Sequence, residues 1–197
     1  MEVVSRLRSE EDQRFVQAAG LVRHDFGLSE PPLLGLGPFE LTNLEVEIAA
    51  LSAKLGPYLL ALLPSQGDPD QARLYCPMGI GGHRNHLSTL LAVRGAFDAL
   101  RDRCTLLLYE DLHYASVPRM REVGLRRAAR IFAGTRLSPI AVPVHSQDAE
   151  RKMRWVSLYA SQHAHAPRLM DFTPASGMAS GLHEIIWQVS PSIGAQA

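Results

Sequence analysis

A continuous apolar run, Cys-Thr-Leu-Leu-Leu-Tyr, occupies positions 104–109 and is the clearest strand of the chain. A strand without polar alternation is typical of a sheet with both faces covered by helices. Further strands are predicted at residues 73–80 and 139–144, and the apolar run at 58–63 is strand-like. Residues 21–26 form another short strand candidate.

Helical periodicity surrounds these strands. Apolar residues recur at helical spacing over residues 3–19, from 42 to about 55 and from about 86 to 101, helix returns over 149–162, and a last amphipathic piece covers about 182–189. Alternating strands and helices predict an α/β fold with a mainly parallel sheet. In such sheets ligands bind at the carboxyl ends of strands. The residues just after Ile80 and Tyr109 are therefore the places where a functional site is expected.

The composition is that of an ordinary globular protein. The chain has 197 residues, 46% of them hydrophobic and 20% charged, which predicts a single domain over 1–197. The formal net charge of zero argues against binding to nucleic acid or to an anionic membrane. No apolar run is long enough to cross a bilayer, and the first residues do not form a secretory signal. Two cysteines, Cys76 and Cys104, favour a reducing, cytoplasmic location.

The first polar stretch, Gly-Ile-Gly-Gly-His-Arg-Asn-His, stands at residues 79–86, at the end of a predicted strand. Its glycines allow a sharp turn from strand to helix. His83 and His86, three residues apart at a helix start, can face one point. A neutral imidazole is a common zinc ligand, and a second one can act as an acid or hydrogen-bond donor. The structural alternative is that His83 or Asn85 caps the helix.

The second polar stretch follows the strand at 104–109 and reads Glu-Asp-Leu-His-Tyr at residues 110–114. The adjacent carboxylates of Glu110 and Asp111 could accept hydrogen bonds from substrate hydroxyls or orient an imidazole. The alternative is an acidic cap on the loop that follows.

Together these stretches resemble the PIG-L (LmbE-like) de-N-acetylase family. Its members often carry Gly-Gly-His-x-Asp-His and, after the next strand, Tyr-Glu-Asp-x-Pro-Tyr. Further matches follow the family's order along nearly the whole chain: Arg8, Glu11 and Asp12 in the first helix, residues 152–162 with Lys152, Tyr159, Ser161 and Gln162, and Glu184 with Trp187.

The resemblance implies a Rossmann-like three-layer fold and a zinc-dependent hydrolase that removes N-acetyl groups from amino sugars or their conjugates. His86 matches the metal-ligand histidine of the family. His83 matches the histidine that stabilises the oxyanion or protonates the leaving amine. Asp111, His113 and Tyr114 are then expected to bind the substrate, a small amino sugar or glycoconjugate.

The chain departs from the family pattern in three ways. The opening strand that ends in His-Pro-Asp-Asp-Glu, which supplies the other protein ligands and the general base, has no match, so the domain is expected to lack its first strand and N-terminal segment. Asn85 stands in place of an aspartate, and His113 in place of a proline. A missing central strand would also allow the chain to form a homo-oligomer.

Three hypotheses follow from these departures. The chain is a de-N-acetylase that is incomplete or impaired as given, or a non-catalytic relative that binds a sugar or a protein partner. In the third hypothesis, a rearranged metal site combines His83 or His86 with Asp111 or His113. Other candidate ligands are less convincing: His24 and Asp25 are expected at a strand end or turn, and His163 and His165 in a solvated loop.

Overall fold

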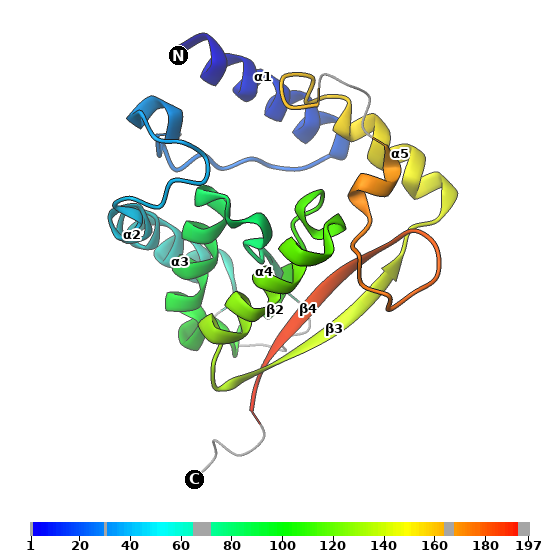
Figure 1. Cartoon of the computed structure of the whole chain (residues 1–197). Helices are drawn as coiled ribbons and strands as arrows, with labels where there is room; N and C mark the ends of the chain where they lie inside the picture. The colour runs from blue at the N-terminus through cyan, green and yellow to red at the C-terminus, as the bar shows by residue number, and fades with distance from the viewer. Residues whose placement is uncertain (1, 30, 65–71, 164–167, 193–197) are drawn as a thin grey trace.

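The computed structural model describes residues 2–29, 31–64, 72–163 and 168–192 (Figure 1). Its longer helices are α1 (Glu2–Ala19), α2 (Leu44–Leu62), α3 (Arg84–Leu100), α4 (Pro118–Ile131) and α5 (Ser146–Val156). Its strands are β1 (Arg73–Pro77), β2 (Thr105–Tyr109), β3 (Thr135–Pro143) and β4 (His183–Pro191). Within these described ranges, no helix is long and apolar enough to cross a membrane.

The strands form one sheet in the order β1-β2-β4-β3. The α/β class is confirmed, and β1 and β2 run parallel, as predicted. The prediction of a mainly parallel sheet does not extend further, because β4 lies antiparallel to both β2 and β3. The amphipathic segment at 182–189 forms β4, which lies in the sheet between β2 and β3. It buries His183, Ile185 and Val189, all at odd-numbered positions.

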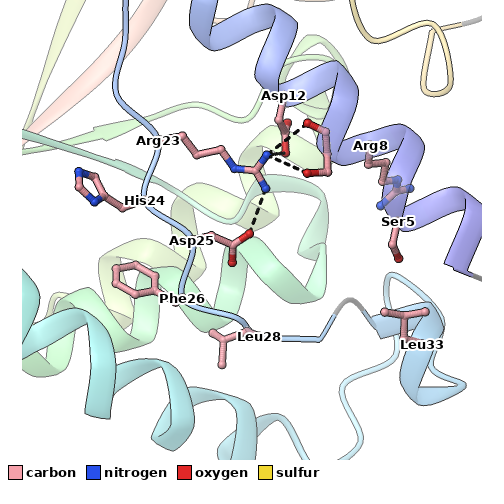
Figure 2. A pocket seen from close by; sticks show the side chains of 10 residues that line it. Ser5, Arg8, Asp12, Arg23, His24, Asp25, Phe26, Leu28 and Leu33 are labelled. Carbon is pink, nitrogen blue, oxygen red and sulfur yellow. Dashed lines mark hydrogen bonds and ion pairs between the residues drawn. The ribbon is translucent and has the colours of Figure 1, made fainter.

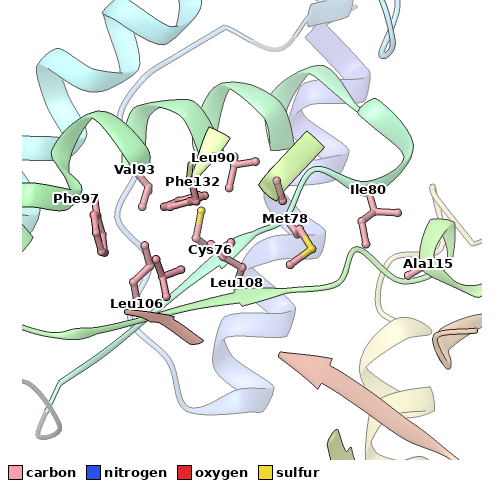
Figure 3. Packing of buried hydrophobic residues seen from close by; sticks show 12 residues of the cluster. Cys76, Met78, Ile80, Leu90, Val93, Phe97, Leu106, Leu108, Ala115 and Phe132 are labelled. Carbon is pink, nitrogen blue, oxygen red and sulfur yellow. The ribbon is translucent and has the colours of Figure 1, made fainter. Parts of the chain in front are cut away.

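The main core lies between the sheet and the helices α3 and α4. Leu106 and Leu108 of β2 pack there with Cys76 of β1, with Leu90, Val93 and Phe97 of α3, and with Phe132 after α4 (Figure 3). Leu108 is fully buried, which explains why the run at 104–109 lacks polar alternation. This core fixes the carboxyl ends of β1 and β2, from which the two polar stretches emerge.

Two strand predictions in the N-terminal part are wrong. Residues 58–62 belong to α2, because Leu59 packs against Leu100 and Cys104 in a second apolar cluster. Residues 21–26 pair with no strand in the described structure. Phe26 instead packs against Tyr58, with ring centroids 5.4 Å apart.

Helix α4 was absent from the sequence-based prediction. It starts at Pro118, a favoured residue for the first helical turn, and its sequence is rich in arginine. Its buried face consists of small residues, Gly124 and Ala128. A Cβ atom at Gly124 would overlap Ile80, so α4 packs directly against the β1–α3 loop. A pattern search for large apolar residues misses a helix that uses small ones for close approach.

Candidate functional site

The loop between β1 and α3 is held in a shape that needs glycine. Gly81 has φ 86°, in the left-handed region that other residues rarely adopt. A Cβ atom at Gly81 would overlap the ring of Tyr114, so the two polar stretches touch at this point. The sequence-based expectation that the two strand ends form one site is therefore consistent with the geometry.

Asp111 joins the two stretches by direct contacts. Its side chain is almost fully buried, and Oδ2 accepts a 2.7 Å hydrogen bond from the backbone N–H of Ile80. Its Oδ1 lies 2.5 Å from Nδ1 of His86. This close contact lacks hydrogen-bond geometry, and it places the carboxylate on the Nδ1 side of the His86 ring.

His83 and His86 are neighbours across the start of α3, with ring centroids 5.0 Å apart. His83 occupies the N-cap position, but its side chain makes no capping hydrogen bond there. The structural alternative for His83 is thus not realised. The geometry leaves its imidazole beside that of His86.

His113 and Tyr114 lie on the same side of the site, with ring centroids 4.1 Å apart. The ring of His163 lies 6.3 Å from that of His113 and 5.7 Å from that of Phe172. His163 lies in a loop, as expected, and is half-buried there; His165 lies outside the described residues. Partial burial lowers the pKa of His113, and the nearby His163 and His86 lower it further.

Glu110, next to Asp111, faces a different environment. Its carboxylate accepts hydrogen bonds from Nε and Nη2 of Arg121, at 2.7 and 2.6 Å, and from Nε1 of Trp187 at 2.9 Å. Neither suggested role, binding of a substrate hydroxyl or capping of a loop, fits these contacts. Glu110 instead ties the end of β2 to α4 and β4.

The other residues that carry the resemblance also contact one another. Side-chain contacts join Glu11 to Ser161, Asp12 to Tyr159, Lys152 to Glu184, and Trp187 to Glu110. Burial and Asp12 together raise the pKa of Tyr159 to about 12, so its hydroxyl stays protonated and donates. These motifs, far apart in sequence, therefore form the frame that surrounds the site.

A polar cavity of about 360 Å³ lies between α1 and residues 23–33 (Figure 2). Arg23 crosses it, with guanidinium nitrogens 3.5 Å from Asp12 and 3.1 Å from Asp25. Asp25 also accepts a hydrogen bond from the backbone of Gly27. His24 packs its ring against Tyr58, 5.0 Å between centroids. His24 and Asp25 are thus engaged by other partners.

The described residues do not fit a zinc ion by themselves. In these parts of the chain, no three His, Cys, Asp or Glu side chains are grouped so that they could hold a metal. A catalytic zinc site normally has three protein ligands. Of the two oxygens of Asp111, Oδ2 accepts from the backbone of Ile80, and Oδ1 lies against the ring of His86. The geometry gives no support to a rearranged site built from these two residues and His113.

No protein-family profile and no curated protein matches the chain. Solved structures do. The A40926 pseudoaglycone deacetylase has a TM-score of 0.64 at 20% identity, with 94% of this chain and 70% of that one covered. A deacetylase in complex with teicoplanin has a TM-score of 0.63 at 19% identity, with 94% of this chain and 73% of that one covered. The zinc-inhibited form of a teicoplanin deacetylase has a TM-score of 0.61 at 17% identity, with 96% of this chain and 75% of that one covered. At this identity the likeness establishes a shared fold, which agrees with the predicted architecture.

Proposed function

We propose that this chain is a hydrolase of the PIG-L type, which removes N-acetyl groups from amino sugars or their conjugates. The observation that carries the proposal is the joining of His83, His86 and Asp111 where the parallel strands β1 and β2 end. This is the position at which α/β sheets bind ligands. The shared fold with deacetylases supports the same reading.

Within the proposed reaction, His83 acts on the acetyl group. An imidazole at this position can donate a hydrogen bond to the oxygen that becomes negatively charged, or a proton to the departing amine. Asp111 orients His86, because the backbone N–H of Ile80 holds Oδ2 and thereby fixes Oδ1 against the Nδ1 side of the imidazole. Tyr114 and His113 form the adjoining surface on which the sugar binds.

The proposed hydrolase also depends on zinc. Bound zinc would polarise the acetyl carbonyl and generate a hydroxide nucleophile. His86 is the residue suited to bind it, because Asp111 holds the Nδ1 side of the ring. The remaining ligands are not supplied by the residues that the structure describes.

A non-catalytic sugar-binding relative is the alternative function. The specific observation in its favour is that His86 and Asp111 form a pair without a third ligand in the described ranges. Asn85, where the family pattern has an aspartate, points the same way, since an amide cannot raise the basicity of a neighbouring imidazole.

Zinc content and acetate release distinguish the two functions. Elemental analysis of the purified chain is combined with acetate assays on N-acetylglucosamine and chitobiose, for the wild type, His83→Ala and His86→Ala. His145→Ala is the matched control, because His145 is an exposed histidine at the start of α5. The hydrolase requires acetate release that falls at least about 100-fold in both site variants, and its zinc dependence requires bound zinc that is lost in His86→Ala.

Zinc-free, folded protein without acetate release would contradict the hydrolase. If that protein still bound the sugars, the alternative function would be supported.

A further inference from the structure

We propose that Phe39 is a specificity-determining residue: a fixed aromatic platform beside His83 against which a ring of the ligand stacks. The inference rests on the site of the proposed function, but it requires only binding there and not hydrolysis. Phe39 lies in a proline- and glycine-rich loop that carries no sequence motif.

The first observation is the exposure of Phe39 at the site. Its side chain leaves 53% of its surface in water, although phenylalanine is usually buried. The contacts that it makes are edge-on, with ring centroids 5.9 Å from His83 and 6.1 Å from Tyr114. A half-exposed aromatic ring next to two candidate site residues is suited to ligand recognition.

The second observation is that the loop carrying Phe39 is anchored on both sides. Arg84 is 2% exposed; its backbone N–H donates to the carbonyl of Pro38. Its guanidinium donates to the carbonyls of Glu40 and Thr42, each at 2.7 Å. Arg84 directly follows His83, so one buried side chain positions both the platform and the candidate catalytic histidine.

The anchoring matters for binding. The same guanidinium is held by the carboxylate of Glu47 on α2, 2.5 Å from Nε. The loop around Phe39 is thereby ordered before a ligand arrives, and a preordered surface loses less conformational entropy on binding. An exposed aromatic ring without a function would not need such support.

The ring contacts extend from Phe39 across the mouth of the site. Tyr114 contacts His113, which contacts His163, which contacts Phe172. Phe172 is buried, so the exposed or half-buried rings of this series are those of Phe39, Tyr114, His113 and His163. The chemistry that such a surface recognises is the flat, weakly polar face of a ring, either the C–H face of a pyranose or an aryl group attached to it.

Binding measurements test the platform directly. The ligands are methyl N-acetyl-β-glucosaminide and its 4-nitrophenyl counterpart, and Kd is measured by calorimetry or ligand-observed NMR on the whole chain. We expect Phe39→Ala to bind roughly 5- to 50-fold more weakly, as for other stacked rings. Phe39→Leu should lose nearly as much, whereas Phe39→Trp should keep the affinity, because a ring face is needed and not apolar bulk.

Leu34→Ala is the matched control, since Leu34 is 57% exposed on the same segment and should leave Kd unchanged. Thermal denaturation of each variant checks that the fold is intact. If Phe39→Ala loses affinity for both ligands, the pyranose is the stacked ring. If it loses affinity for the nitrophenyl ligand alone, the aryl group is the stacked ring.

Unchanged affinity in Phe39→Ala, or no binding of either ligand by the wild type, would overturn the platform. Binding that depends on Phe39 without any acetate release would leave the platform standing and refute the hydrolase, so the two failures are distinguishable.

Discussion

Glu110 and Asp111 are adjacent in sequence and equally buried, at 3% and 2% exposure, yet they serve different parts of the molecule. Glu110 faces a permanent positive charge, the guanidinium of Arg121, and the indole N–H of Trp187. Asp111 faces a backbone N–H and an imidazole. The guanidinium beside the first carboxylate carries a permanent charge, whereas the imidazole beside the second can be charged or neutral.

This difference separates a structural carboxylate from a functional one. The Glu110–Arg121 pair joins the end of β2 to α4 through two hydrogen bonds. The carboxylate of Asp111 instead lies against the Nδ1 side of the His86 ring. Two residues of one motif thus divide into support for the fold and control of the candidate site.

Loss of Glu110 should have the largest effect on stability. Glu110→Ala leaves the 13% exposed Arg121 side chain without its partner, so we expect the free energy of unfolding to fall by about 3–5 kcal/mol. Urea denaturation measures the change.

The control for this prediction is Glu122→Ala, which removes a surface pair with Arg126 in which both side chains are 63% exposed. It should cost less than about 0.5 kcal/mol. A similarly small cost for Glu110→Ala would show that the buried pair is not structural and would remove the contrast with Asp111.

Asp111→Asn should act on the site more than on the fold. The amide oxygen can still accept from Ile80, but the negative charge that Asp111 places beside His86 is lost. We expect acetate release, or zinc affinity, to fall about 10- to 100-fold, as for other partners of ligand histidines. Steady-state assays and metal titration measure this. A drop in stability as large as that of Glu110→Ala, with activity intact, would reverse the assigned roles.

The sequence predicted those parts of the fold that depend on local pattern. The strand at 104–109 and the helix beginning near His86 are confirmed, because their apolar spacing alone places them against the core. The strand predicted at 58–63 is wrong, because a short apolar segment shows no clear helical or strand period. The segment is helical in the structure, where it packs against Leu100. Strand β4 joins the sheet through partners remote in sequence, so its direction was not readable.

The site follows the same division. His83, His86 and Asp111 could be found because motifs mark them, and the structure brings them together. Phe39 and His163 could not, because their place depends on contacts between distant segments. The opposite roles of Glu110 and Asp111 were also hidden, since a motif does not say toward which neighbour each carboxylate turns. One signal was available: Arg84 is a charged residue next to glycines at a buried strand end.

Trp187→Phe should have a smaller effect, confined to the structural side. The variant keeps an aromatic ring but loses the N–H that donates to Glu110 and part of the indole that packs against the core, while Glu110 retains both bonds from Arg121. We expect a loss of about 1–2 kcal/mol in the free energy of unfolding, the usual worth of a hydrogen bond to a charged group. Urea denaturation gives the value, and acetate release should not change. Reduced activity at unaltered stability would connect Glu110 to the site.

Glu11 offers the subtlest test, because it is a buried carboxylate held by a neutral partner. Burial raises its pKa, but the hydrogen bonds from the hydroxyl and backbone N–H of Ser161, with smaller contributions from the charges of Arg14 and Arg8, outweigh this, so the pKa lies below the ordinary 4.5. A carboxyl with a lowered pKa stabilises the fold fully above its unfolded value and loses this contribution as pH falls through its folded value.

Glu11→Gln should therefore weaken the fold at about pH 7 and flatten the loss of stability between about pH 5 and pH 3. Urea midpoints across this range measure it, with Glu10→Gln, an exposed residue near Arg6, as the control. If both variants lost stability at low pH in the same way as the wild type, the interaction with Ser161 would not depend on the ionised form of Glu11. Neutral partners would then not suffice to make a buried carboxylate structural, and the charge of Arg121 would be the decisive feature of the Glu110 side.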